Sequence, residues 1–233
     1  MDNWFNLLCR RWLFLFKTLI KTKTLITSRR HIIVGAGGFG REVLSWFDDS
    51  LSTMENFFFL DDHETTIRLG DLRIPCLGKI NDFRYKNGDS VYLTISNPKF
   101  KKSVVERMLI NGTTFDHFIH HSSIVSRGAT LGKGIIICPY SIVSDGVNLG
   151  DYCTVNLSCS IGHDVTIGSF TTLSSHVDIT GNCSVGDRNF FGSGSRVLPG
   201  KQIGSDATVG AGAVVIRNIS NHQTFYAPPA KLL

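Results

Sequence analysis

Aliphatic and aromatic residues recur at every sixth position along the C-terminal half of the chain. A helix would repeat near 3.6 residues and an isolated strand near two, so this period indicates a short strand, a corner and another short strand. Three such segments would close a triangular coil of about 18 residues whose repeat residues point to the axis. The series predicts a parallel β-helix and comprises Val125, Leu131, Ile137, Val143, Leu149, Val155, Ile161, Ile167, Leu173, Ile179, Val185, Phe191, Val197, Ile203, Val209 and Val215.

A different pattern precedes the repeat. The apolar segment His31–Val34 leads into Gly35-Ala-Gly37-Gly38-Phe39-Gly40, and residues 41–47 then show helical spacing. Strand, glycine loop and helix are the context in which such glycines approach a phosphate group. Further strands are expected at 56–60, 91–95 and 115–119, and a helix at 98–110. A domain this short matches one mononucleotide-binding half of a dinucleotide-binding fold, so a nucleotide-sugar is a more suitable ligand than NAD. The alternative is a glycine turn that only packs the helix against the strand.

Charge and cysteine usage narrow the possibilities. The net charge of +5 comes from a basic, apolar leader at residues 1–30, and the rest of the chain is close to neutral, so we expect no nucleic-acid partner. The longest apolar run of the leader, residues 12–16, is too short to span a bilayer. The leader is a misassigned translation start, a segment that packs on the body, or a helix in weak contact with a membrane surface. Cys153, Cys159 and Cys183 fall on small inward positions, as expected of a protein in the reducing cytoplasm.

The two halves together resemble a known family. The repeat is similar to that of hexapeptide-repeat acyltransferases, and the motifs GAGGFGREV at 35–43, FLDD at 59–62, NLSCSIGHD at 156–164 and PAK at 229–231 resemble the nucleotide-amino-sugar N-acetyltransferases and the related sialic-acid O-acetyltransferases. The family usually has glycine where Ala227 stands. The resemblance implies an α/β Rossmann-like domain at 31–114 that binds the nucleotide-sugar. By the same resemblance, this domain is followed by an all-β left-handed parallel β-helix at 115–233, which is the acetyltransferase domain.

The resemblance also assigns a catalytic pair. His163 lies two residues after the inward Ile161, at a predicted corner, and Asp164 follows it directly. In the family this histidine is the general base and the adjacent acid raises its basicity. Asp145, one coil earlier, is an alternative acid, and an exposed corner histidine without catalytic function is the alternative for His163 itself.

Binding residues follow from the same resemblance. The substrate is expected to contact the glycine loop and the carboxyl ends of two strands, and acetyl-CoA is expected to lie along the prism. The substrate residues are Gly37, Gly38, Phe39, Asp61, Asp62 and Ser96, and the acetyl-CoA residues are Thr172, Gly181, Ser193 and Ala211. The family often has histidine where Thr172 stands.

The predicted function is acetyl-CoA-dependent N-acetylation of a nucleotide-linked amino sugar in bacterial surface-glycan synthesis, by a cytoplasmic homotrimer that needs no metal. O-acetylation of sialic acid or a related sugar would use the same base and coenzyme. A metal-dependent hydratase would need three convergent histidines, and His163 and His176 lack the paired spacing. A non-catalytic nucleotide-binding scaffold is the remaining alternative.

Overall fold

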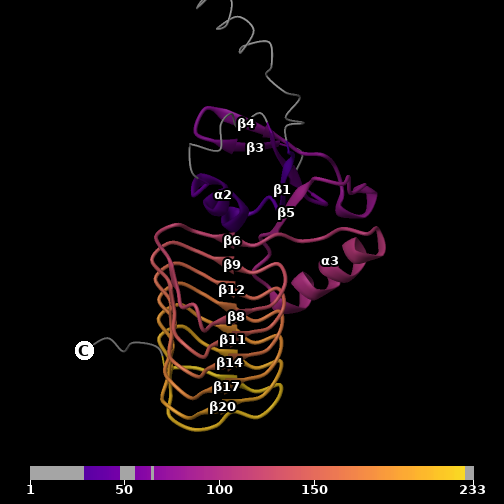
Figure 1. Ribbon diagram of the computed structural model, residues 1–233. Helices are drawn as coiled ribbons and strands as arrows, with labels where there is room; N and C mark the ends of the chain where they lie inside the picture. Colours follow the sequence, from indigo (N-terminus) through magenta and orange to yellow (C-terminus); the bar gives the residue numbers. More distant parts are fainter. Residues whose placement is uncertain (1–28, 48–55, 64–65, 229–233) are drawn as a thin grey trace, which may run out of the picture.

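The computed structural model describes residues 29–47, 56–63 and 66–228, which form a small α/β layer at one end of a triangular prism (Figure 1). Residues 1–28 of the leader lie outside the described residues, as does the membrane contact expected of that segment. The PAK motif at 229–231 lies outside them as well.

The prism is a parallel β-helix, as the period of six predicts. Each strand pairs with the strand one coil away, so that Val143 lies beside Ile161 and Ile161 beside Ile179. Three sheets form the faces. The β7–β22 face contains β7 (Ile124–Val125), β10 (Ile142–Val143), β13 (Ser160–Ile161), β16 (Asp178–Ile179), β19 (Arg196–Val197) and β22 (Val214–Val215). The β8–β20 face contains β8 (Thr130–Leu131), β11 (Asn148–Leu149), β14 (Thr166–Ile167), β17 (Ser184–Val185) and β20 (Gln202–Ile203). The β6–β23 face contains β6 (Phe118–Ile119), β9 (Ile136–Ile137), β12 (Thr154–Val155), β15 (Thr172–Leu173), β18 (Phe190–Phe191), β21 (Thr208–Val209) and β23 (Thr224–Phe225).

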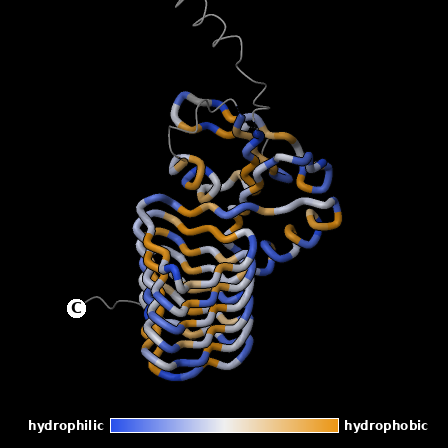
Figure 2. The backbone as a smooth tube through the Cα atoms, viewed as in Figure 1, coloured by the Kyte–Doolittle hydropathy of each residue, from blue (hydrophilic) through white to orange (hydrophobic). Residues whose placement is uncertain are grey.

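The repeat residues fill the axis of the prism. From Ile137 to Val215 every one is at most 3 % exposed, and the first two, Val125 and Leu131, pack half-buried against the same cluster. Hydrophobic residues accordingly recur at matching places in successive coils (Figure 2). The inward cysteines Cys153, Cys159 and Cys183 are buried in this core too, as expected. The spacing between paired residues of successive coils changes at the C-terminal end, where Phe225 pairs with Val209, 16 residues earlier.

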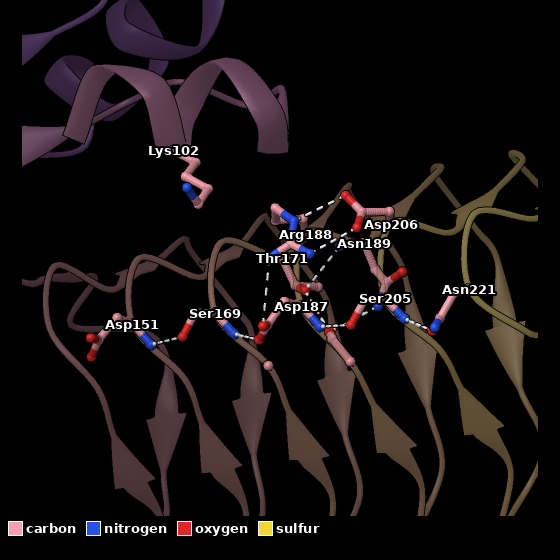
Figure 3. Close-up of polar contacts among 12 residues, drawn as sticks. Lys102, Asp151, Ser169, Thr171, Asp187, Arg188, Asn189, Ser205, Asp206 and Asn221 are labelled. Atoms are coloured by element: carbon pink, nitrogen blue, oxygen red, sulfur yellow. Dashed lines mark hydrogen bonds and ion pairs between the residues drawn. The ribbon is translucent and has the colours of Figure 1, made fainter. Parts of the chain in front are cut away.

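One corner carries a ladder of polar side chains that the hydrophobic pattern does not reveal. Each accepts a hydrogen bond from the backbone N–H of the residue one coil earlier, at 2.8–3.1 Å (Figure 3). These N–H groups would otherwise lack a strand partner, and a buried unpaired N–H is costly. The acceptors are Asp151, Ser169, Asp187, Ser205 and Asn221.

The N-terminal layer is a three-stranded parallel sheet with the order β2–β1–β5. Its strands are β1 (His31–Val34), β2 (Phe57–Leu60) and β5 (Ser90–Leu93). Alternate residues of β1 enter two different cores: Ile32 and Val34 pack with α3 (Pro98–Ile110), and Ile33 packs with α2 (Gly38–Ser45). The helices therefore cover opposite faces of the sheet, and a 3-10 turn at Ile80–Asp82 precedes β5.

An antiparallel hairpin was not anticipated from the sequence. It consists of β3 (Thr66–Leu69) and β4 (Leu72–Pro75), joined through Gly70 and Asp71. The signal was present, because Ile67 and Ile74 alternate with polar residues on either side of a Gly-Asp turn. Both isoleucines are buried beside α2. The hairpin places side chains close to the glycine loop that the linear motif did not suggest.

Candidate functional site

His163 lies at the corner between β13 and β14, where the chain turns from the β7–β22 face to the β8–β20 face. Its Nδ1 lies 2.8 Å from Asp164 Oδ2. The His163 and Asp164 side chains are 64 % and 63 % exposed, so the pair is open to a substrate. With Nδ1–H donating to the carboxylate, Nε2 is left as the unprotonated nitrogen, as a general base requires.

The backbone directs Asp164, rather than Asp145, toward the imidazole. Asp164 is in the left-handed region, with φ of 57°, which aspartate tolerates better than most residues. Asp145 instead accepts a hydrogen bond of 2.8 Å from the hydroxyl of Ser126, one coil farther away. The alternative acid weighed from the sequence is thus directed away from His163 in the structure.

Gly181 lies one coil beyond His163 at the same corner. A Cβ atom at Gly181 would be only 2.6 Å from Nε2 of His163, so the absence of a side chain makes room for the imidazole. The carbonyl of His163 accepts from the N–H of Asn182 at 2.9 Å, which fixes the backbone of the two coils. Gly181 therefore determines where the ring lies, whatever else it contacts.

The other residues expected at acetyl-CoA lie elsewhere. Ser193 and Ala211 are exposed at the corner between the β6–β23 and β7–β22 faces, one coil apart. A face of six residues spans at most about 20 Å. The predicted coenzyme residues thus fall on both edges of the β7–β22 face rather than around one pocket.

Thr172 does not fit the expected contact with acetyl-CoA. Its side chain is buried under α3, and its hydroxyl accepts a hydrogen bond of 2.8 Å from Nζ of Lys101. Lys101 also donates to the carbonyl of Tyr152 (3.1 Å) and the hydroxyl of Thr154 (2.9 Å). We therefore assign Thr172 to the contact between α3 and the prism and remove its hydroxyl from the coenzyme site.

Lys101 was not anticipated, because a lysine on a predicted helix is usually solvated. It is fully buried, and its three N–H groups have three oxygen acceptors. No carboxylate is among them, and burial without a counter-charge lowers the pKa of Lys101 to about 7.

The glycine loop has the geometry that its motif predicts. Gly35 has φ of +108°, and a Cβ on Gly40 would collide with the carbonyl oxygen of Gly35, so these two glycines shape the turn and let α2 approach β1. Gly37 and Gly38 have open space where a side chain would be. Phe39 is half-buried beside the α2 core. A ligand can therefore approach the backbone at Gly37 and Gly38.

The two acids of the FLDD motif also hold the protein's own backbone. Asp61 accepts from the N–H of Ala36 in the glycine loop at 2.8 Å and from the N–H of His63 at 2.9 Å. Asp62 accepts from the N–H of Ile80 at 3.0 Å and lies 3.7 Å from the guanidinium of Arg107. Both therefore shape the carboxyl end of the sheet.

Ser96 lines a cleft of about 550 Å³ between the start of α3 and the prism. Its opposite wall includes Phe190 and an ion pair in which Arg188 donates to both oxygens of Asp206, at 3.0 and 2.8 Å (Figure 3). The hydrogen bond from Arg188 lowers the pKa of Asp206. These prism residues were missed from the sequence, because nothing local indicates that α3 lies beside them.

Among residues 29–47, 56–63 and 66–228, no helix is long and apolar enough to cross a membrane. The same residues contain no group of three or more histidine, cysteine and acidic side chains that could hold a metal ion.

Comparison with known proteins agrees with this architecture. Residues 30–108 match the PglD N-terminal domain. The chain is 26% identical over 202 residues to GDP-perosamine N-acetyltransferase of Escherichia coli O157:H7, covering 81% of this chain and 79% of the relative.

Two solved structures cover nearly the whole fold. A histidine-to-asparagine mutant of perosamine N-acetyltransferase from Caulobacter crescentus, in complex with CoA and GDP-perosamine, gives a TM-score of 0.77 at 26% identity and covers 87% of this chain and 95% of its own. The acetyltransferase domain of PglB from Neisseria gonorrhoeae FA1090, in complex with acetyl coenzyme A, gives a TM-score of 0.78 at 27% identity and covers 88% and 99%. With a region that matches the PglD N-terminal domain followed by a hexapeptide-repeat β-helix, the chain is similar over most of its length to nucleotide-amino-sugar N-acetyltransferases, and it is an acetyltransferase.

Proposed function

We propose that this enzyme transfers the acetyl group of acetyl-CoA to the amine of a nucleotide-linked amino sugar used in bacterial surface-glycan synthesis. The observation that carries the proposal is the exposed His163–Asp164 pair, with Nδ1 held by the carboxylate. The similar proteins from Escherichia coli and Caulobacter crescentus are N-acetyltransferases named for perosamine, which supports an amino sugar as acceptor.

The chemistry follows from the state of the imidazole. As the sugar amine attacks the thioester carbonyl, Nε2 of His163 accepts the proton that the amine loses. The carbon–nitrogen bond forms, the carbon–sulfur bond breaks, and the proton passes to the departing thiolate of CoA. Asp164 stabilises the transient imidazolium through Nδ1–H, as in other carboxylate–histidine pairs.

In this proposal the two parts of the chain divide the substrates. Residues 31–114 bind the nucleotide-sugar through Gly37, Gly38 and Phe39 in the glycine loop, with Asp61 and Asp62 beside it; Ser96 adds a contact from the cleft at α3. Residues 115–233 bind acetyl-CoA through Gly181, Ser193 and Ala211. The open backbone at Gly37 and Gly38 supports the first part of this assignment.

We further propose that the active species is a homotrimer in the cytoplasm. The coenzyme residues at two different corners support a site shared between neighbouring prisms, in which the Gly181 corner of one meets the Ser193 corner of the next. Five cysteines of the described part, Cys76, Cys138, Cys153, Cys159 and Cys183, are free thiols, which fits a reducing compartment.

The test is release of CoA thiol from acetyl-CoA in the presence of UDP-, dTDP- or GDP-linked amino sugars, with free sialic acid as the O-acetylation alternative. His163→Asn should lower kcat by about 10²–10⁴, the usual share of general base catalysis. His176→Asn is the matched control, because His176 is also an exposed corner histidine. If His163→Asn lowers kcat by less than about threefold, far below the range expected for a general base, His163 is not the base. If sialic acid is acetylated and the nucleotide-linked amino sugars are not, the acceptor group is a hydroxyl and not an amine.

A further inference from the structure

Two arginines face each other across the β3–β4 hairpin. Arg68 of β3 is the direct cross-strand partner of Arg73 of β4, and both side chains are exposed. Like charges directly opposite in an antiparallel pair destabilise it. The arrangement therefore costs stability unless something negative lies between or above the two guanidinium groups.

A third arginine approaches from the neighbouring helix. Arg41 lies in the first turn of α2, where a positive charge is disfavoured by the helix dipole. That turn contains no acidic residue, and Gly37 supplies no capping side chain. Three positive side chains and an uncapped helix start are thus directed to one region.

No counter-charge for these arginines is found in the described part of the chain. In that part, four other arginines do form ion pairs, each with its guanidinium group within 4 Å of an aspartate: Arg29, Arg30, Arg107 and Arg188. Arg41, Arg68 and Arg73 have no carboxylate within that distance in residues 29–47, 56–63 and 66–228. Their charge is available to a ligand.

The three arginines line one pocket of about 440 Å³. Ala36 of the glycine loop forms part of its wall, together with Thr66 and Ile67 of β3. The N–H of Ala36 is already held by Asp61, so the loop backbone beside the pocket has a fixed position. The pocket thus joins the glycine loop to a positively charged hairpin.

We propose that Arg41, Arg68 and Arg73 form an oxyanion subsite that binds the diphosphate linking nucleoside and sugar in the substrate. The inference rests on the proposed nucleotide-sugar substrate and deepens it. Guanidinium groups pair with phosphate oxygens through two parallel N–H donors, and a diphosphate offers enough oxygens for all three. A bound diphosphate also neutralises the repulsion between Arg68 and Arg73, so binding and hairpin stability are coupled.

The test measures binding directly. Isothermal titration with inorganic pyrophosphate, UDP, GDP and dTDP is compared for the wild type, Arg68→Gln, Arg73→Gln and Arg41→Gln. A lost charge-assisted contact should weaken binding of these ligands by roughly 10–100-fold. Arg84→Gln is the matched control, because Arg84 is an exposed arginine of the same domain that donates to the backbone carbonyls of Asn81 and Phe83, and this variant should bind as the wild type does.

Two further readouts distinguish a diphosphate subsite from a coenzyme contact and from a role in folding alone. CoA also carries phosphates, and its affinity should be unchanged in the arginine variants; an equal loss for CoA would assign the arginines to the coenzyme instead. The midpoint of thermal unfolding without ligand should stay equal or rise in Arg68→Gln and Arg73→Gln, because the repulsion is relieved, whereas an arginine that only supports the fold would lower it.

The outcome is independent of the thiol-release assay. Pyrophosphate binding lost in the variants supports the subsite even if no nucleotide-sugar is acetylated, in which case only the proposed function fails. Acetylation of a nucleotide-sugar with wild-type affinity for pyrophosphate and nucleoside diphosphates in all three variants would overturn the subsite alone.

Discussion

The position of the His163 imidazole depends on two neighbours, a carboxylate and a glycine. Asp164 fixes Nδ1 from the same corner, and Gly181 leaves space against Nε2 from the next coil. A histidine–aspartate pair is visible in the sequence, but the need for glycine one coil later appears only when the coils are stacked. Gly181 is therefore a positioning residue for the proposed base, in addition to its expected contact with acetyl-CoA.

Replacing Gly181 by alanine tests this geometry. A Cβ at 2.6 Å from Nε2 would displace the ring, because the imidazole moves more easily than the backbone. We expect Gly181→Ala to lower kcat by about tenfold or more, a part of what a general base contributes, and to leave the thermal midpoint nearly unchanged. Steady-state kinetics and thermal denaturation measure the two effects.

Ser184→Ala is the control, because Ser184 is exposed on the adjacent face. If the alanine at 181 raised only the KM for acetyl-CoA and left kcat intact, Gly181 would contact the coenzyme without positioning the base.

Asp61 shows how a motif residue can act through its neighbours. The acid at this point of a mononucleotide fold is expected at the ribose. Here both of its carboxylate oxygens also accept backbone N–H groups, from Ala36 and His63. Loss of Asp61 would therefore disturb the glycine loop as well as any ribose contact, and a raised KM for the nucleotide-sugar in such a variant would report both effects together.

At the scale of elements, α3 joins the two parts of the chain. Its apolar residues Val104, Val105 and Met108 pack on the sheet, while Lys101 enters the outer surface of the β6–β23 face. The lysine has hydrogen-bond acceptors but no counter-charge, so its protonated form is disfavoured in the folded protein. The stability of this contact should therefore depend on pH.

The direction of the pH dependence follows from the two pKa values of Lys101. Its pKa falls from 10.5 to about 7 on folding, so between these values the unfolded chain holds a proton that the folded chain lacks. Raising the pH then favours the folded state, with a slope of at most about 1.4 kcal/mol per pH unit. Below pH 7 both states are protonated, and the cost of the buried charge is fully present.

We expect the free energy of unfolding of the wild type to rise between pH 7 and 8.5 relative to Lys101→Met, which carries no titratable group. Urea denaturation at several pH values measures both proteins, and the difference cancels the titration of all other groups. Lys102→Met, at an exposed neighbouring position paired with Glu106, is the control and should run parallel to the wild type. Parallel profiles for Lys101→Met as well would show that Lys101 keeps its proton in the fold.

The prism could be predicted because every coil repeats the same requirement. One side chain in six must fill the axis, so the sequence has an apolar residue at every sixth position from Val125 to Val215. The strands at 31–34 and 56–60 and the helix at 98–110 were likewise indicated by local pattern, and the structure differs from these by at most a residue at one end. The hairpin at 66–75 was missed although its alternation was present.

The candidate site could be predicted only where its residues are neighbours in sequence. His163 and Asp164 are adjacent, and so are the glycines of the loop. Contacts that join distant segments had no local signal: Lys101 of α3 with Thr172, Gly181 against His163, and Arg41 beside the β3–β4 hairpin. Thr172 was assigned to the coenzyme for the same reason, because its burial depends on a helix about 70 residues earlier.

At the scale of the whole molecule, the three faces of the prism differ. The β6–β23 face is covered in its upper coils by the N-terminal layer and α3. The β8–β20 face presents only exposed polar residues, Thr130, Asn148, Thr166, Ser184 and Gln202. The β7–β22 face exposes Ile124, Ile142 and Val214, and lies between the two corners that hold the proposed coenzyme residues. Apolar side chains on one uncovered face fit contact with other copies of the chain in a closed cyclic trimer.

The proposed trimer predicts that assembly and activity are lost together. Ile142→Asp places a charge on the β7–β22 face, at a side chain 43 % exposed in the single chain, so the isolated subunit should still fold. Its mass by light scattering should fall from three times 25.7 kDa to that of one chain. Its acetyl transfer should fall as well, because the His163 corner of one prism then no longer meets the Ser193 corner of another. Gln202→Asp, the same charge on the β8–β20 face two coils from His163, should leave mass and turnover unchanged. Full activity in a monomeric Ile142→Asp protein would show instead that one chain contains the complete site.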